Sequence, residues 1–235
     1  MKEKYIIPVS IIIAGLLISI AILISSNFGK ETKAPDNKET KVNRELTWEE
    51  VSKKLRLPDE TDWVRGDLNK AKVVFIEYSD LECPFCKEFH KTMLKVIEKY
   101  NDDVAWIYRH FPIESLHKKA MLESIAVECV GKLGGNEAFW IYLDKIFEVT
   151  PSNDGLNLSL LPKFAEEIEI NKEDFNNCYN KRETEDKIKK QISEALSLGI
   201  RGTPFTIVLI GEDKIPIPGY VDFSKIDSFL NDILK

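Results

Sequence analysis

The pattern of apolar and charged positions separates an uncharged start from a longer part in which both kinds of residue alternate. Residues 1–4 are a short basic start, and residues 5–26 contain no charged side chain. At about 1.5 Å per residue, a helix over this run reaches about 33 Å, enough to cross the hydrocarbon core of a bilayer. We therefore predict a transmembrane anchor at residues 5–26 after a cytoplasmic start at residues 1–4. A cleaved signal peptide is the alternative, although its apolar region usually has only about 7–15 residues.

Residues 27–45 are rich in Gly, Pro, Thr, Asn, Lys and Glu and carry only scattered apolar side chains. This composition is typical of a flexible tether. The pattern predicts a single-pass protein of the cell membrane, with its N-terminus in the cytoplasm and residues 46–235 as an extracytoplasmic domain.

The next part of the chain has the pattern of a β-α-β unit. A capping box at Thr47 and Glu50 predicts a short helix first. Residues 72–79 form a β-branched apolar run of strand length, residues 83–100 repeat apolar side chains with a helical period, and residues 104–108 form a second strand. Such units favour parallel pairing of the two strands through a right-handed crossover.

Helical periodicity dominates the middle of the chain, at about residues 115–198. Strand character returns at residues 204–210, a Gly-Glu-Asp turn follows, and residues 214–217 can pair back as a hairpin. An amphipathic helix at residues 223–233 completes the order. This order predicts an α/β fold in which a mixed sheet with helices on its faces is interrupted by an all-helical insertion.

Composition and charge narrow the classes of function. The chain of 235 residues is 43% hydrophobic and has a formal net charge of −6. This hydrophobic content supports a globular core and excludes disorder along the whole chain. Lys and Arg are interleaved with Asp and Glu, so the sequence has no basic patch and we expect no nucleic-acid partner.

Cys83 and Cys86 belong to a Cys-Pro-Phe-Cys motif at the predicted junction of a strand and a helix. Free N–H groups at a helix N-terminus favour a thiolate at Cys83, and Cys86 is near enough to resolve a mixed disulfide formed on it. Pro84 suits the first helical turn because it has no N–H and a preset φ. The spacing and the position together indicate a redox-active pair.

A structural disulfide and half of a zinc site are the alternatives for this motif. Zinc would need two further ligands, usually as a second close pair, but Cys129 and Cys178 are far apart in the sequence. We therefore expect no metal and no cofactor besides the Cys83–Cys86 disulfide. The histidines have no ligand spacing and are interpreted as structural or surface groups: His90, His110 and His117.

Several segments together resemble the DsbA-like branch of the thioredoxin superfamily, in its membrane-anchored form. They include the run through the cysteine motif and shorter matches along most of the chain that follows: residues 74–87, 108–112, 116–120, 128–129, 139–140 and 199–205. The resemblance implies a thioredoxin-like fold with a helical insertion, in agreement with the order of elements.

The resemblance also implies a cis-proline at Pro204, preceded by Thr203, that faces the cysteines and positions a substrate strand. A trans proline that begins a strand is the alternative. Glu77 lies on an otherwise apolar strand, where burial would raise its pKa and let it relay the proton of Cys86. The family carries a buried acid at this place, and exposure of Glu77 at a sheet edge is the alternative.

Cys129 and Cys178 resemble the second cysteine pair of many anchored DsbA-like proteins. We therefore expect a structural disulfide, with two separate buried thiols as the alternative. Phe85 stands where strongly oxidising relatives often carry a histidine. Because Phe85 cannot donate a hydrogen bond to the thiolate, the resemblance does not transfer an extreme redox potential.

We predict an exported, membrane-tethered thiol–disulfide oxidoreductase that exchanges the Cys83–Cys86 disulfide with cysteines of extracytoplasmic polypeptides, acting as an oxidase. The resemblance implies reoxidation by a membrane partner of the DsbB or VKOR type. A reductase or isomerase on the same fold is one alternative. A metal-handling or assembly factor without enzymatic activity, with the cysteines as ligands, is the other.

Overall fold

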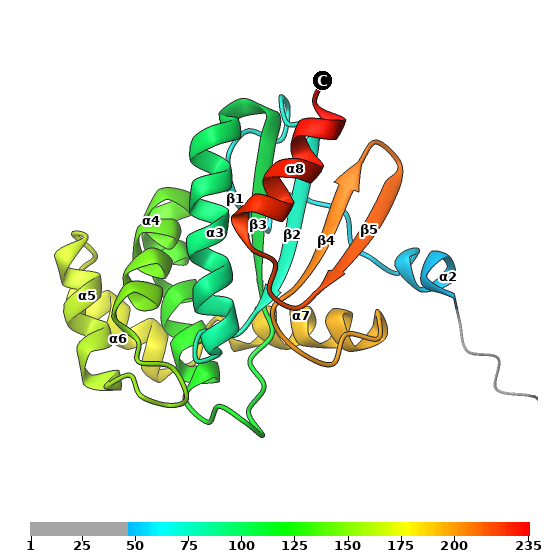
Figure 1. The fold of residues 1–235 in the computed structure, drawn as a ribbon. Helices are drawn as coiled ribbons and strands as arrows, with labels where there is room; N and C mark the ends of the chain where they lie inside the picture. The colour runs from blue at the N-terminus through cyan, green and yellow to red at the C-terminus, as the bar shows by residue number, and fades with distance from the viewer. Residues whose placement is uncertain (1–46) are drawn as a thin grey trace, which may run out of the picture. The chain divides into compact units, whose positions relative to one another are not determined.

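The computed structural model describes residues 47–235, which Figure 1 shows in colour. They belong to one compact unit. The predicted cytoplasmic start at residues 1–4, the anchor at 5–26 and the tether at 27–45 lie outside the described residues. Within residues 47–235, no helix is both long enough and apolar enough to cross a bilayer.

Five strands form a mixed sheet in the order β1-β3-β2-β4-β5. Strands β2 and β3 run parallel, whereas the β1–β3, β2–β4 and β4–β5 pairs are antiparallel. The strands are β1 Trp63–Arg65, β2 Val73–Ser79, β3 Val104–His110, β4 Phe205–Ile210 and β5 Asp213–Pro218. The predicted β-α-β unit and the C-terminal hairpin are confirmed. Strand β1 was not predicted, because three residues carry too little alternation to be seen in a sequence.

The helices lie close to their predicted positions. They are α2 Trp48–Ser52, α3 Pro84–Tyr100, α4 Ala120–Val149, α5 Leu161–Glu167, α6 Lys172–Asn180, α7 Glu185–Ser197 and α8 Phe223–Ile233, with short 3-10 turns at Asn101–Asp103 and Leu158–Leu160. The capping box predicted at the start of α2 is present: the Thr47 hydroxyl accepts from the backbone N–H of Glu50, and the Glu50 side chain accepts from the backbone N–H of Thr47.

Both faces of the sheet are covered by helices (Figure 1), and alternate residues of β2 point to opposite faces. Val73 and Phe75 pack into the larger core together with side chains of α3, α4 and α8. Ile76 and Tyr78 pack on the other face, where residues of α7 cover the sheet. Because Glu77 has the same parity as Phe75, the strand directs its carboxyl group into the larger core.

Helices α4 to α7 lie between β3 and β4 and form the predicted helical insertion. Helix α4 is kinked at Gly135, whose φ of 78° and ψ of −168° are not helical. A positive φ is readily adopted only by glycine, so the Gly-Gly pair in the sequence marks the position of this kink.

Cys129 of α4 and Cys178 of α6 form a disulfide, with their Cα atoms 5.9 Å apart. Both cysteines are buried in the larger core. The alternative of two separate thiols is therefore wrong for this pair. The disulfide closes a loop of sequence separation 49 within the insertion.

A second connection between elements is a buried group of charges on the α7 side of the sheet. The guanidinium of Arg109 in β3 is fully buried and donates to both carboxylate oxygens of Asp62, at 3.1 and 2.9 Å. It also donates to Glu194 of α7 at 3.1 Å. A buried charge destabilises a fold unless it is paired, so these contacts hold the segment before β1 and helix α7 on the sheet.

We predict that replacing both Cys129 and Cys178 by alanine lowers the free energy of unfolding by about 2–4 kcal/mol, because the cross-link restricts the unfolded chain. Urea unfolding of the wild-type and variant proteins under oxidising conditions measures the difference. A reductant strong enough to open the disulfide should bring the two proteins to similar stability. Equal stability under oxidising conditions would show that the cross-link contributes nothing.

Candidate active site

Cys83 and Cys86 lie where strand β2 leads into helix α3. Cys83 is the N-cap residue of α3, and Pro84 occupies the first turn. Pro84 needs no partner for an N–H and has a backbone angle suited to the start of a helix. This arrangement places the Cys83 sulfur at the unpaired N–H groups of the first turn, and both cysteines are free thiols.

The Cys83 thiol is stabilised as a thiolate. Hydrogen bonding from the Cys86 side chain lowers the pKa of Cys83 to about 6, although burial acts in the opposite direction. The backbone N–H groups of Cys86 and Phe85 and the side chain of Thr203 lower this pKa further. Free N–H groups at a helix N-terminus stabilise negative charge, so Cys83 forms a thiolate more readily than an ordinary cysteine.

The Cys86 thiol has the opposite character. It is completely buried, and its sulfur accepts the backbone N–H of Asp80 at 3.5 Å. Burial raises the pKa of Cys86 well above its usual value, and the neighbouring charges of Cys83 and Glu77 raise it further. The two sulfurs therefore differ in role: Cys83 carries negative charge readily, and Cys86 retains its proton.

Glu77 lies in the core with no exposed surface, so the alternative of exposure at a sheet edge is wrong. Its Oε2 atom accepts the indole N–H of Trp106 at 2.9 Å. Burial raises the pKa of Glu77 to about 8, although the nearby Ser79 hydroxyl and the hydrogen bond from Trp106 lower it. At neutral pH this carboxyl group is a neutral acid near Cys86, which is the property that a proton donor for a buried thiolate needs.

Thr203 and Pro204 lie beside Cys83, although they are distant in the sequence. The Thr203–Pro204 peptide bond is cis, so the alternative of a trans bond is wrong. The Cys83 sulfur lies 3.6 Å from the carbonyl oxygen of Thr203. Phe85, between the two cysteines, is 62% exposed and offers an apolar side chain next to the thiols.

Asp80 organises the loop before the motif, a role that the sequence did not reveal. Its Oδ1 atom accepts the N–H of Glu82 at 2.9 Å, and its Oδ2 atom accepts the N–H of Ile113 at 2.7 Å. The same Oδ2 atom lies 3.0 Å from Nδ1 of His117. The backbone carbonyl of Asp80 accepts the N–H of Cys83 at 3.1 Å. One buried side chain thus joins the motif to the segment that leads into α4.

Glu82 makes a second connection, to the segment after α4. Its carboxylate accepts the backbone N–H groups of Gly155 and Leu156 at 3.2 and 3.3 Å and the hydroxyl of Thr150 at 3.4 Å. Burial, with the adjacent Glu82 carboxyl group, raises the pKa of Glu123 in α4 to about 10. Glu123 is therefore a neutral acid next to Glu82. No spacing in the sequence indicates these contacts.

The histidines are not surface groups, which corrects one of the two roles considered for them. His90 pairs with Asp144 at 2.8 Å, and burial lowers its pKa. Burial also lowers the pKa of His110, which lies 3.5 Å from a Glu128 oxygen. His117 is nearly buried and contacts the loop of the cysteine motif. Among residues 47–235, no three His, Cys, Asp or Glu side chains are grouped to hold a metal ion.

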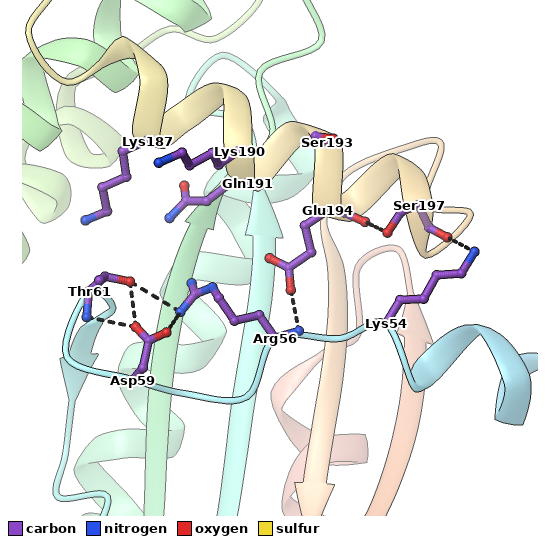
Figure 2. Close-up of a pocket in the computed structure, with 10 residues that line it drawn as sticks. All are labelled: Lys54, Arg56, Asp59, Thr61, Lys187, Lys190, Gln191, Ser193, Glu194 and Ser197. Carbon is purple, nitrogen blue, oxygen red and sulfur yellow. Dashed lines mark hydrogen bonds and ion pairs between the residues drawn. The ribbon is translucent and has the colours of Figure 1, made fainter.

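A cavity of about 660 Å³ lies between α7 and the segment that joins α2 to β1, and Figure 2 shows the residues that line it. Its polar groups pair across this interface: the backbone N–H of Arg56 donates to Glu194 at 2.7 Å, and Lys54 donates to the carbonyl of Ser197 at 3.4 Å. No cysteine lines it. The cavity belongs to the packing of this segment on α7 and not to the thiol site.

A family model described as thioredoxin matches residues 59–231. The chain belongs to the thioredoxin family. This thioredoxin-family chain is similar to the crystal structure of Pseudomonas aeruginosa DsbA2, with a TM-score of 0.61 and 29% identity over 77% of this chain and 100% of that chain. The domain at residues 47–235 is that of a DsbA-like thiol–disulfide oxidoreductase.

Two curated relatives of this DsbA-like chain differ in length. It is 28% identical over 143 residues to the Na(+)/H(+) antiporter NhaA 3 of Salinispora tropica, and the match covers 61% of this chain but only 21% of the antiporter. It is 27% identical over 147 residues to the probable disulfide bond formation protein D of Bacillus anthracis, covering 59% of this chain and 65% of that protein.

We predict that alkylation of Cys83 by iodoacetamide in the reduced protein follows a titration with a midpoint near pH 6. Because hydrogen bonding from Cys86 is the largest cause of the low pKa, Cys86→Ala should move the midpoint upward. Rates measured from about pH 4 to pH 9 in both proteins provide the test. A wild-type midpoint near the free-cysteine value of about 8.5 would contradict the geometry.

We predict that Glu77→Gln reduces the pH dependence of stability. The folded pKa of Glu77, about 8, exceeds the ordinary value of 4.5, so its contribution is full below about pH 4.5 and is lost as pH rises to about 8. Replacing the acid by its neutral isostere should remove a fall on the order of 4 kcal/mol. Urea unfolding of the oxidised proteins, in which the two cysteines do not titrate, measures this. Parallel pH profiles for the two proteins would contradict a buried neutral Glu77.

Proposed function

We propose that this protein is an exported, membrane-tethered thiol oxidase that passes the Cys83–Cys86 disulfide to cysteines of extracytoplasmic polypeptides. The position of Cys83 at the N-terminus of α3, where hydrogen bonding from Cys86 and backbone N–H groups lowers its pKa, is the observation that carries the proposal. A stabilised thiolate favours the reduced form of the pair, so the disulfide form is an oxidant.

In the proposed reaction, a substrate thiolate attacks the Cys83 sulfur of the disulfide. A bond forms between the substrate sulfur and Cys83, and the bond between Cys83 and Cys86 breaks. Cys86 leaves as a buried thiolate and takes a proton from the neutral Glu77 carboxyl group. A second substrate thiolate then attacks the substrate sulfur of the mixed disulfide, and Cys83 leaves as a thiolate. Two electrons pass from the substrate dithiol to the two enzyme sulfurs.

Thr203 and Pro204 are proposed to position the substrate strand beside Cys83. The contact of 3.6 Å between the Cys83 sulfur and the Thr203 carbonyl supports this role, because a peptide bonded to Cys83 must pass the same backbone. Proline cannot donate a backbone hydrogen bond, so the neighbouring backbone can pair with an extended peptide. The exposed Phe85 adds an apolar contact next to the bond that is exchanged.

The location and the partners are also proposals. The uncharged run at residues 5–26 supports a membrane anchor, and the tether at residues 27–45 would let the domain reach exported substrates near the membrane. Reduced Cys83 and Cys86 would then be reoxidised by a membrane partner of the DsbB or VKOR type. No metal or organic cofactor is required, because the disulfide itself carries the two electrons.

We predict that Cys83→Ser abolishes oxidative refolding of a reduced protein substrate, because the sulfur that receives the substrate is lost. Cys86→Ser should instead accumulate mixed disulfides on Cys83, which non-reducing electrophoresis and mass spectrometry of exported proteins identify. Full refolding activity in Cys83→Ser would exclude the proposed enzyme.

A redox titration of the Cys83–Cys86 pair against glutathione separates the oxidase from its alternatives. A potential near about −120 mV supports the oxidase, and a potential near about −270 mV supports a reductase. Titration of the Cys129–Cys178 double alanine variant in parallel removes any contribution from the second pair of cysteines.

A further inference from the structure

We propose that His117, held by Asp80, is a positioning residue that stabilises the Cys83 thiolate from outside the cysteine motif. The inference rests on the proposed thiol chemistry and names the side chain that tunes it. His117 lies in the segment before the helical insertion and supplies the positive charge that Phe85 cannot supply within the motif.

The geometry places Asp80 between the imidazole and both sulfurs. Oδ2 of Asp80 lies 3.0 Å from Nδ1 of His117. The backbone of the same residue accepts the N–H of Cys83 at 3.1 Å and donates to the Cys86 sulfur at 3.5 Å. A charge on the imidazole therefore acts on Asp80, whose backbone is hydrogen-bonded to both cysteines of the motif.

Burial makes this charge effective. His117 is 7% exposed, Asp80 is fully buried and Cys83 is 5% exposed. Charges that are removed from water interact more strongly than the same charges on an exposed surface, where solvent and salt screen them. An imidazolium in this position can act on the thiolate, whereas an exposed lysine at a similar distance would have little effect.

The surroundings of His117 keep it protonated to higher pH than a free histidine. Burial lowers its pKa, but the hydrogen bond and charge of Asp80, together with the charges of Cys83 and Asp154, raise it more, so that the net direction is upward. Asp80 comes from the loop after β2, Cys83 from the start of α3 and Asp154 from the loop after α4. The Cys83 thiolate and the His117 imidazolium thus stabilise each other.

Three other basic side chains around the motif are bound elsewhere or neutral. Lys87 of α3 donates to the backbone carbonyls of Glu148 and Thr150, at 3.2 and 2.6 Å. Burial lowers the pKa of both His90 and His110, so these imidazoles are neutral at physiological pH. His117 is the histidine with an upward pKa and a contact to the loop of the motif.

The negative charge of Asp80 is the reason that a cation is needed near Cys83. Its carboxylate holds the loop together through the N–H groups of Glu82 and Ile113, but a negative charge near Cys83 opposes thiolate formation. Protonated His117 neutralises this carboxylate. The loop therefore retains its hydrogen-bond acceptor without raising the pKa of Cys83.

The test compares wild-type protein with His117→Asn, in which the amide can still donate to Asp80 but carries no charge. The pKa of Cys83, measured by thiolate absorbance at 240 nm, should rise by about 1 on the pH scale. If the pKa of Cys83 rises from about 6 to about 7, the equilibrium constant of the pair with glutathione at pH 7 changes approximately fivefold. The Cys83–Cys86 disulfide then becomes less oxidising.

His90→Asn provides the control, because His90 is also a buried histidine paired with a carboxylate, the partly exposed Asp144, at 2.8 Å and away from the loop. This variant should leave the pKa of Cys83 unchanged, while near-ultraviolet circular dichroism reports the packing of both variants. An equal rise of the Cys83 pKa in His90→Asn would overturn the proposal, because loosened packing would then explain the effect. An unchanged Cys83 pKa in folded His117→Asn would also overturn it.

A reciprocal measurement keeps the proposal testable if His117→Asn does not fold. NMR titration of the His117 ring should give a lower pKa in Cys83→Ser than in the reduced wild-type protein, because the thiolate is missing. An identical titration would overturn the proposal. These readouts are independent of turnover: failure of oxidative refolding with an intact coupling between His117 and Cys83 would contradict the proposed oxidase and not this inference.

Discussion

The first turn of helix α3 holds the two sulfurs of the motif in opposite environments, and the chemistry of the site depends on this difference. The Cys83 sulfur lies at the start of the helix, where hydrogen bonding from the Cys86 side chain and the nearby backbone N–H groups lowers its pKa, whereas the Cys86 sulfur is fully enclosed by the core and accepts the N–H of Asp80. Hydrogen bonding lowers the pKa of one sulfur, and burial raises the pKa of the other. The Cys83 sulfur therefore carries a negative charge readily, and the Cys86 sulfur keeps its proton. Thiol–disulfide exchange requires this separation of roles.

The helical insertion contributes to the site through the segments at the two ends of α4. The segment before α4 reaches the motif through Asp80, and the segment after it does so through Glu82. The insertion therefore supports the backbone of the loop that carries Cys83, besides covering the sheet. The Cys129–Cys178 disulfide lies within the same insertion and joins α4 to α6. The stability of the insertion and the geometry of the redox loop are consequently linked.

Two buried acids are neutral around neutral pH, and this affects the charge of the site. Burial raises the pKa of Glu77 to about 8, and burial with the adjacent Glu82 carboxyl group raises that of Glu123 to about 10. Because a buried unpaired charge is strongly unfavourable, both groups retain their protons instead. Glu77 and Glu123 therefore do not repel the negative charge that forms on Cys83, although both are acidic residues.

The sequence by itself determined the features that depend on short-range order. Hydrophobic periodicity predicted the β-α-β unit, the helical insertion and the C-terminal hairpin, and the position of Cys83 at a strand-to-helix junction predicted that Cys83 and Cys86 form a redox pair. The resemblance to a family supplied the pairing of Cys129 with Cys178 and the cis bond before Pro204. Only the tertiary structure decided how Asp80, Glu82, His117 and Glu123 meet. These side chains come from segments more than 30 residues apart, and no local pattern encodes contacts that form when a sheet, a loop and an insertion pack together.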